Sequence, residues 1–254
     1  AASDGEQTAQ YQSRLHMLMG IAAGFAAMAM LGLVAAHLLA QPGQKTYATA
    51  VGGHEIIKFA DGTRIELNTN TVLRTRMTTA ERTVWLDRGE AYFDVRHDAA
   101  HPFKVITGKN VVTDLGTKFS IRRDGSHLEV ALLDGRVRFG TASGAVQSVL
   151  LTPGDTVTAT ADSISVAKKP IATIADALSW RQGVLDFDNA LLSDVAEEFN
   201  RYNHEKIAVI DPAAASVRIT GTFRTDNADA FIGTVQRVFR LHVRRDGETV
   251  TISR

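Results

Sequence analysis

The sequence predicts a mainly β domain followed by a small α+β domain, with one apolar helix ahead of both. Three observations support this fold class: short runs of alternating polar and apolar residues over residues 46–167, two helical apolar stripes within residues 181–254, and an uncharged run at residues 17–36. Alternation with a period of two is typical of half-buried strands, whereas apolar residues three or four apart indicate a helix.

The uncharged run is long enough to cross a membrane. A helix rises about 1.5 Å per residue, so residues 17–36 would span roughly the 30 Å hydrocarbon core of a bilayer. We therefore expect a transmembrane helix within residues 17–40, after a short cytoplasmic stub of residues 1–16. Arg14 gives a slight preference for a cytoplasmic N-terminus. Two alternatives stay open: a cleaved signal peptide, since the small residues at 34–36 resemble a cleavage site, and a buried core helix.

Composition excludes several classes of function. The chain has 28 Lys and Arg against 28 Asp and Glu, so no basic surplus points to a nucleic-acid partner. It has no cysteine, which excludes disulfides, thiolate nucleophiles and zinc–cysteine sites. The sequence also lacks the serine-hydrolase, zinc-protease and phosphate-loop motifs, so we expect no enzyme active site and no cofactor.

Residues 46–167 read as short strands separated by turns. The segments HEIIKF and TRIELN flank Asp61-Gly62 and predict a hairpin, because Asp-Gly adopts the positive φ angles of a tight turn. Two later Asp-Gly pairs mark further turns. A spacing of about 8–12 residues between turns, without a helical period, predicts an all-β domain. A sandwich, a barrel and a stacked β-solenoid all fit this pattern.

Residues 181–254 predict a duplicated β-α-β unit. The tripeptide Asp-Asn-Ala occurs at residues 188–190 and again at 226–228, each time between a strand pattern and a helix pattern. A last segment, ETVTIS, supplies a closing strand, which gives a small α+β domain with two helices on a sheet. Residues 168–180, which contain a Lys-Lys-Pro break and a short helical pattern, are predicted to link the two domains.

Each predicted helix carries an apolar stripe and a polar cap. Asp188 or Asn189 is expected to cap the first helix, and Asp226 or Asn227 the second, because such side chains accept hydrogen bonds from free helix N–H groups. The apolar stripes are Leu191, Leu192, Val195, Phe199 and Tyr202 in the first helix, and Ala228, Phe231, Ile232, Val235, Val238 and Phe239 in the second.

Other polar clusters favour structural roles. His97 and His101 lie near Asp94 and Asp98, which are metal-ligand types, but they fall in a strand end and a proline turn that fix no ligand geometry, so we predict no metal site. Two strand carboxylates, at positions 186 and 188, are also expected to be structural.

The triplet 115–117 offers one specific reaction. In Leu115-Gly116-Thr117 the threonine hydroxyl can attack the preceding glycine carbonyl if a turn strains the peptide, converting the amide to an ester that water cleaves. Such an attack needs an activating base, and the sequence identifies none. The alternative is an ordinary β-turn.

Several ordered motifs resemble the FecR-type regulators of iron uptake. They are DGTRIELNTNTVLRTRM, VWLDRGEAYFDVRHDAAHPFKVITG, VVTDLGTKFSI and VALLDGRVRF, followed by WRQGVLDFDNALLSDVAEEFNRYN. In the last segment the positions that fit the family signature are Trp180, Gly183, Leu185, Phe187, Leu191, Val195, Arg201 and Tyr202. The resemblance covers about residues 46–254, together with the predicted membrane helix.

The resemblance implies a signalling role. Such proteins are single-pass proteins of the bacterial inner membrane whose C-terminal domain lies in the periplasm and contacts the signalling domain of an outer-membrane TonB-dependent transporter. Their cytoplasmic region, largely absent from residues 1–16, binds an extracytoplasmic-function sigma factor. Periplasmic and intramembrane proteases cleave the regulator so that the sigma factor can act. The expected role is control of iron-siderophore uptake genes. Some members self-cleave at a Gly-Thr bond, which Gly116-Thr117 matches.

The duplicated C-terminal unit resembles the secretin/TonB short N-terminal domain. Pairing through an edge strand would be a natural docking mode. A basic patch near the C-terminus serves either as a solvated edge that prevents aggregation or as a surface for an acidic partner. The expected partner-binding residues are Ile219, Gly221, Phe223, Arg240, Arg244 and Arg245.

A second class of function is a membrane-anchored glycan-binding or cell-envelope domain. All-β scaffolds often bind glycans, and Trp85 and Tyr92 are aromatic side chains that can stack on sugars. Core packing is the alternative role for both.

Overall fold

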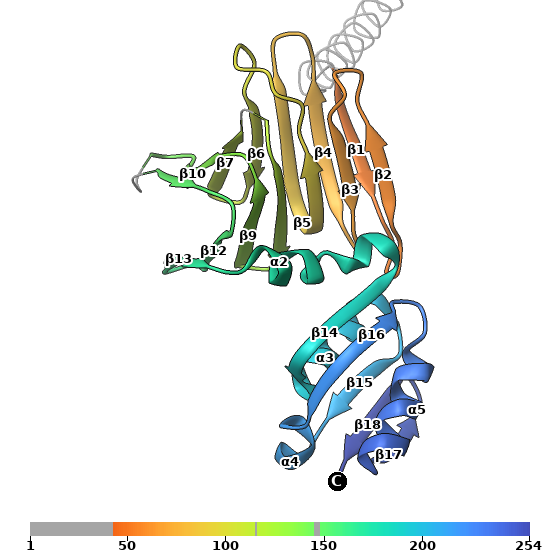
Figure 1. Ribbon diagram of the computed structural model, residues 1–254. Coiled ribbons are helices and arrows are strands. Elements are labelled where there is room, and N and C mark those ends of the chain that lie inside the picture. The colour runs from red at the N-terminus through yellow and green to blue at the C-terminus, as the bar shows by residue number, and fades with distance from the viewer. Residues whose placement is uncertain (1–42, 115, 145–147) are drawn as a thin grey trace, which may run out of the picture. The chain divides into compact units, whose positions relative to one another are not determined.

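The computed structural model describes residues 43–114, 116–144 and 148–254 (Figure 1). The predicted stub of residues 1–16 and transmembrane helix of residues 17–40 lie outside these described residues. No helix within the described ranges is long and apolar enough to cross a membrane. Lys45–Arg254 forms one compact unit.

The first part of this unit is built of strands, as the sequence predicts. The strands are β1 Gln44–Ala48, β2 Glu55–Lys58, β3 Arg64–Leu67, β4 Val72–Met77, β5 Arg82–Asp94, β6 Phe103–Thr107, β7 Asn110–Asp114, β8 Lys118–Asp124, β9 His127–Asp134, β10 Val137–Thr141, β11 Val149–Leu151, β12 Asp155–Ala159 and β13 Ile164–Lys168. The predicted hairpin around Asp61-Gly62 is confirmed, since β2 pairs antiparallel with β3.

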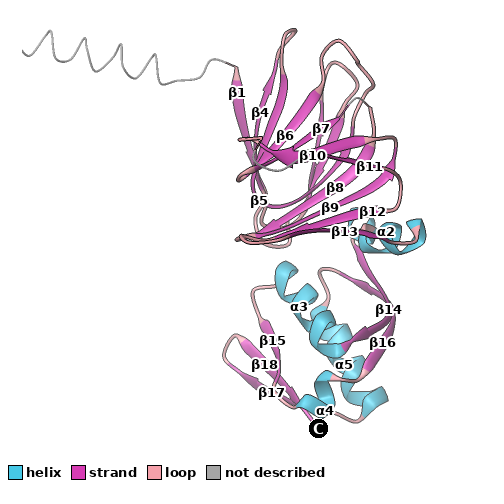
Figure 2. Cartoon of the chain, turned by 90° about the vertical axis from the view of Figure 1, so that its left-hand side faces the viewer, coloured by secondary structure: helices cyan, strands magenta, loops and turns pink. Residues whose placement is uncertain are grey.

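The long strand β5 belongs to two sheets. Its first half pairs with β4 and β6, in the order β11-β10-β7-β6-β5-β4-β1, and its second half pairs with β8 and β3, in the order β13-β12-β9-β8-β5-β3-β2. The two sheets face each other (Figure 2) and share one apolar core. In this core the Phe93 ring stacks on the Phe119 ring with their centroids 4.8 Å apart, and the Phe103 ring meets the Phe93 ring edge-on with a centroid distance of 6.1 Å. Of the architectures that the sequence allows, the structure therefore has a sandwich.

Gly89 marks the point where β5 changes sheets. Its φ is 87°, and a Cβ atom there would lie 2.3 Å from Thr71 Oγ1 and 2.5 Å from Thr71 Cα. The same Thr71 hydroxyl accepts a hydrogen bond from Glu90 N at 3.0 Å. Only glycine permits this close approach, which fixes the position of Glu90 on the outer face of the second sheet.

The C-terminal part contains two β-α-β units, β14-α3-β15 and β16-α5-β17, as predicted. The strands form two sheets, β14-β16 and β15-β18-β17, instead of the single expected sheet, and both helices pack against strands of both sheets (Figure 2). The elements are α2 Ile171–Ala177, η1 Ser179–Gln182, β14 Val184–Leu191, α3 Leu192–Tyr202, β15 Lys206–Val209, α4 Pro212–Ala215, β16 Arg218–Arg224, α5 Ala228–Phe239, β17 His242–Asp246 and β18 Thr249–Ser253.

One of the two predicted helix caps is wrong. Asn227 caps α5, where its Oδ1 accepts a hydrogen bond from Ala230 N at 3.0 Å. The N-cap of α3 is Leu191, which has no side-chain cap, instead of Asp188 or Asn189. The reason is that β14 stays paired with β16 up to Leu191, so the strand leads directly into the helix.

The predicted linker, residues 168–180, contains α2 and the start of η1. Its buried side chains belong to the same apolar cluster as side chains from the outer face of the sandwich. The linker contributes Ile174, Leu178 and Trp180, and the sandwich contributes Tyr92 and Ala131.

Candidate functional site

Two buried glutamates lie on the outer face of the second sheet. Glu66 on β3 is 1 % exposed and Glu90 on β5 is 6 % exposed. Glu66 is opposite Tyr92 in the β3–β5 pairing, and Tyr92 lies two residues after Glu90, so the three side chains share one face. Burying a carboxylate is costly unless it is paired and hydrogen-bonded. The partners that satisfy both glutamates come largely from the C-terminal segment.

Glu66 is held mainly by two arginines. Its Oε1 accepts hydrogen bonds from Arg181 Nη2 at 2.6 Å and Nε at 3.1 Å, and Arg64 Nη2 lies 2.8 Å away. The Arg181 guanidinium also lies 3.7 Å from the centre of the Tyr92 ring. His54 Nε2 is 3.6 Å from the second oxygen, Oε2. Residue 181 thus connects η1 to the sandwich through charge and stacking together.

Glu90 has a complete set of partners. Oε1 accepts a hydrogen bond from Trp180 Nε1 at 2.9 Å, and Oε2 accepts from Arg201 Nη2 at 2.6 Å and Asn68 Nδ2 at 2.9 Å. Asn68 Nδ2 also donates to the Tyr202 hydroxyl at 2.7 Å. Burial would lower the pKa of Arg201, but the neighbouring carboxylates raise it above its usual value. For Tyr202, which loses a proton to become charged, burial has the opposite effect and raises the pKa.

Sequence reasoning missed this network. The available signal was an acidic residue inside an apolar strand pattern, as in Ile65-Glu66-Leu67 and in the Gly-Glu-Ala of β5. Alternation places both glutamates on an outer face, which by itself suggests solvent. Only the tertiary contact with α3 and η1 shows that this face is covered.

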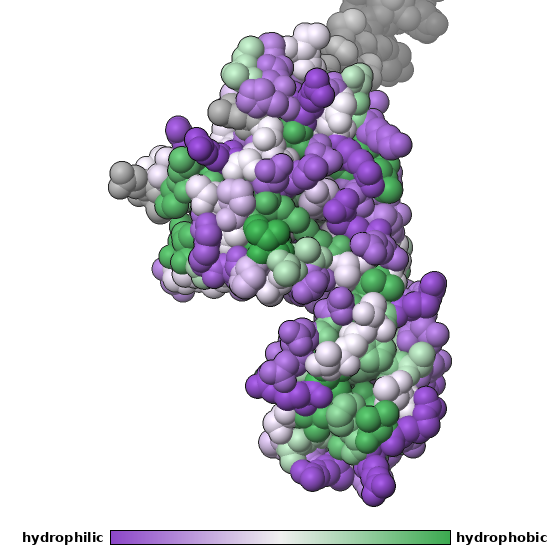
Figure 3. Space-filling view, in the orientation of Figure 1, coloured by the Kyte–Doolittle hydropathy of each residue, from purple (hydrophilic) through white to green (hydrophobic). Residues whose placement is uncertain are grey.

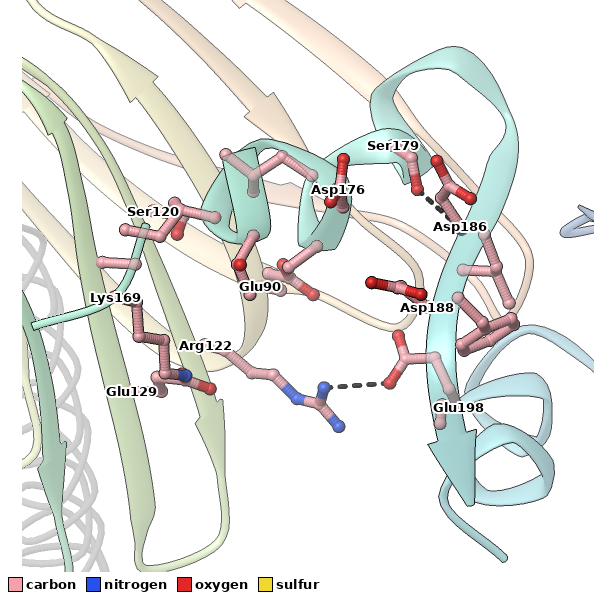
Figure 4. A pocket seen from close by; sticks show the side chains of 18 of the residues that line it. Glu90, Ser120, Arg122, Glu129, Lys169, Asp176, Ser179, Asp186, Asp188 and Glu198 are labelled. Carbon is pink, nitrogen blue, oxygen red and sulfur yellow. Dashed lines mark hydrogen bonds and ion pairs between the residues drawn. The ribbon is translucent and has the colours of Figure 1, made fainter. Parts of the chain in front are cut away.

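A cleft adjoins the network. It has a volume of about 520 Å³ and is lined by the sheet, α2, β14 and α3 (Figure 4). Asp186 and Asp188, which were expected to be structural, are both exposed and line this cleft. Arg122 crosses it to donate to Glu198 at 2.9 Å.

Gly116 and Thr117 lie in the short connection between β7 and β8, next to Leu115, which is outside the described residues. Gly116 has φ 138°, and its N–H donates to Asp114 Oδ1 at 2.8 Å. Thr117 is 4 % exposed, and its Oγ1 has no hydrogen-bond partner among the described residues. A Cβ atom on Gly116 would lie 2.8 Å from His97 Nδ1, so an imidazole lies beside this peptide. Sequence reasoning found no such base.

Comparison with known proteins then identifies the family. The family model "FecR protein" matches residues 45–138, and the model "FecR, C-terminal" matches residues 184–252. The chain belongs to the FecR family. The comparison with curated proteins finds no match.

Solved structures with the same fold as this FecR-family chain come from Parabacteroides distasonis ATCC 8503. Two crystal structures described as a candidate anti-sigma factor match with TM-scores of 0.65 and 0.66. In each case the identity is 22 %, with 83 % of this chain and 99 % of the other covered. At this identity the likeness concerns the fold.

The strand residues expected to bind a partner lie on β16 of the FecR C-terminal region. Among the described strands β16 pairs only with β14, which leaves its other edge open. Ile219 is 2 % exposed and faces the core. Phe223 is half-buried and packs edge-to-face on Phe231 at 5.2 Å. Gly221 has φ 149° and lies beside the Phe223 ring.

The three basic residues expected to bind a partner differ in their surroundings. Arg240 ends α5 and is exposed. Arg244 is also exposed, with Asp246 3.6 Å away. Arg245 is engaged by Glu205 at 3.6 Å and by Asp229.

The aromatic residues considered for glycan stacking are occupied by arginines. Tyr92 is 4 % exposed and lies under Arg181. Trp85 is half-buried. The guanidinium carbons of Arg74 and Arg76 lie 5.5 and 5.6 Å from the centre of its ring.

The histidine and aspartate cluster near the β5–β6 connection lies in an exposed turn. His101 Nδ1 is 3.0 Å from Asp98 Oδ2. Across residues 43–114, 116–144 and 148–254, no group of three or more His, Asp or Glu side chains is arranged to hold a metal ion.

Proposed function

We propose that this FecR-family protein is a single-pass regulator of the bacterial inner membrane that controls an extracytoplasmic-function sigma factor. The two family matches, in the family's order along the chain, carry this proposal. The uncharged run at residues 17–36 supports the membrane anchor. The fold shared with candidate anti-sigma factors is consistent with it. In this proposal the C-terminal domain lies in the periplasm, and proteases release the sigma-binding region.

The signal enters through the C-terminal region. We propose that its secretin/TonB-like double β-α-β unit docks on the signalling domain of a TonB-dependent transporter, as for iron-siderophore uptake. The open edge of β16 supports strand pairing. The visible face of the C-terminal part also carries hydrophobic residues between polar ones (Figure 3). Within residues 184–254 the large exposed apolar side chains are Ile210, Val238 and Phe239.

A reporter gene under the cognate sigma factor tests the docking step. Arg240→Glu combined with Arg244→Glu reverses two exposed charges, and we expect induction by the transporter's ligand to fall about tenfold. Arg138→Glu, at an exposed position on β10, is the control and should induce normally. Normal induction in the double variant at equal protein levels would exclude these arginines from docking.

We further propose self-cleavage between Gly116 and Thr117. Thr117 Oγ attacks the Gly116 carbonyl carbon, the C–N bond breaks, and the nitrogen takes the hydroxyl proton. Water then hydrolyses the resulting ester, which leaves a Gly116 carboxylate and a free Thr117 amine. Two observations support this reaction: the Thr117 hydroxyl has no hydrogen-bond partner in the part of the chain that the structure describes, and the His97 imidazole, a candidate base, lies nearby.

Intact-mass measurement tests the cleavage. The parent chain should yield two fragments, ending at Gly116 and starting at Thr117. Thr117→Ala should stay intact, Thr117→Ser should still cleave because it keeps a hydroxyl, and His97→Asn should cleave more slowly. A parent chain that stays whole after purification and incubation would refute the reaction.

A further inference from the structure

The cleft beside Glu90 lies over the outer face of the second sheet. Its floor comes from β8, β9 and β12, and its walls come from α2, β14 and α3 (Figure 4). Ile174, Leu178 and Leu185 contribute apolar surface. At about 520 Å³ the cleft is large enough for several side chains of a ligand.

The cleft carries an excess of negative charge. Seven carboxylates and three basic side chains line it. The basic residues are already paired: Arg122 with Glu198 at 2.9 Å, Lys169 with Glu129 at 3.0 Å, and Arg201 with Glu90 at 2.6 Å. Within the described part of the chain, four carboxylates of the cleft have no basic partner: Asp176, Asp186, Asp188 and Asp194.

These four carboxylates come from three different elements, α2, β14 and α3. Figure 4 shows Asp176, Asp186 and Asp188 around the same opening. No three acidic or histidine side chains among the described residues are close enough to share a metal ion. The charge is therefore spread along the cleft, which suits an extended ligand with several cationic groups.

A buried hydroxyl in the floor gives an independent indication of a ligand. Thr156 on β12 is 2 % exposed, and its Oγ1 has no hydrogen-bond partner among the described residues. Val157, the next residue, is in the sandwich core, so Thr156 faces the opposite side, where it is paired with Ala131 in the lining of the cleft. An unsatisfied buried hydroxyl costs about 1–3 kcal/mol, and a donor such as an ammonium group would satisfy it.

We propose that this acidic cleft binds Lys or Arg side chains of an extended basic peptide segment of a partner protein. The apolar walls suit the methylene stems of these side chains, and the carboxylates suit their charged ends. Recognition is through side chains instead of strand addition, because Ser179 already donates to Val184 O and accepts from Asp186 N along β14. This site goes beyond the docking proposed for β16 and does not depend on it.

Fluorescence anisotropy with the full chain in detergent tests the site. The probe is a labelled peptide of alternating Lys and Leu, and a Glu-Leu peptide of the same length is the negative probe. We expect Asp186→Asn combined with Asp188→Asn to weaken Lys-Leu binding about tenfold, and Thr156→Val to weaken it about threefold. Asp246→Asn combined with Glu248→Gln removes the same charge outside the cleft and should change affinity less than about twofold.

Two results would overturn the proposal. One is equal affinity of the Lys-Leu peptide for the cleft variant and the charge-matched control, which would indicate non-specific attraction. The other is binding of spermine without binding of the peptide, which would assign the cleft to a small polyamine. Thr156→Val replaces a buried hydroxyl by a methyl group of similar size. The unfolding curve of this variant shows whether its weaker peptide binding is caused by a loss of folding.

Discussion

Arg240 ends α5 in a left-handed conformation, with φ 55°. A side chain at such a position costs about 1–2 kcal/mol, whereas glycine adopts it freely at a smaller entropic cost. The residue that the docking proposal uses thus also stores local strain.

Arg240→Gly should therefore raise the free energy of unfolding by up to about 1 kcal/mol. Chemical denaturation measures the change. Arg244→Gly, on the extended strand β17, is the matched control and should destabilise the fold, because glycine is unfavourable in strands. If Arg240→Gly lost as much unfolding free energy as the control, the left-handed backbone at position 240 would not be strained.

Asp155 gives the fold a specific acid sensitivity. Burial alone would raise its pKa, but the Thr152 N–H, the Thr152 hydroxyl and the Lys168 ammonium donate to its carboxylate and hold the pKa below the usual value. A lowered folded-state pKa stabilises the protein above the unfolded pKa of about 4, and this stabilisation is lost as pH falls through the folded pKa.

Unfolding free energies of the parent and Asp155→Asn, measured from pH 7 down to pH 2, test this sign. We expect the variant to be less stable at pH 7 and the two curves to converge at the acid end. A constant difference across the range would show that the carboxylate's charge is not what Thr152 and Lys168 stabilise.

At the scale of elements, β5 organises the sandwich because one strand serves both sheets. Gly89→Ala should lower the free energy of unfolding by about 2–4 kcal/mol, since the new Cβ would meet Thr71 Cα at 2.5 Å. Gly62→Ala is a matched control: Gly62 has a similar φ of 90°, but nothing lies within 4 Å of its Cβ position. Equal losses in the two variants would mean that backbone conformation, and not contact with Thr71, decides the effect.

Local patterns predicted most of these elements. The alternation that predicts strands is confirmed by the burial of Ile65, Leu67, Val84 and Leu86, because side-chain direction follows from the two-residue period. The cap of α3 was predicted wrongly, because pairing of β14 with β16 over-rides the preference of Asp188 for a cap. Local sequence also does not specify which strands share a sheet, so it left sandwich, barrel and solenoid open.

In the described unit as a whole, two buried glutamates of the sandwich, Glu66 and Glu90, pair with arginines of the C-terminal segment. These pairs were not predictable from local sequence, because Glu90 and Arg201 come from elements far apart in the chain. Buried ion pairs add little net stability compared with apolar packing, but removing one partner leaves a buried charge. Glu90–Arg201 therefore favours one arrangement of α3 against β5, and Glu66–Arg181 one arrangement of η1 against β3.

The two contacts should respond differently to truncation. Arg201→Ala removes the cation that pairs with Glu90 among the described residues, and it should cost about 3–5 kcal/mol of unfolding free energy. Arg181→Ala should cost less, because Arg64 remains 2.8 Å from Glu66. Denaturation of both variants measures the difference. A larger loss in Arg181→Ala would place the main contact at Glu66 instead of Glu90.

Site-directed cross-linking in living cells tests whether this FecR-family chain receives its signal through the C-terminal region. A photoreactive amino acid replaces exposed Arg244 on β17, or exposed Arg138 on β10 as the control, and mass spectrometry identifies the cross-linked protein. We expect position 244, and not position 138, to capture the periplasmic domain of a TonB-dependent transporter. Two results would contradict signal entry through the C-terminal region. One is capture of that transporter from position 138 alone. The other is capture of no envelope protein from position 244 while the cue still induces the reporter.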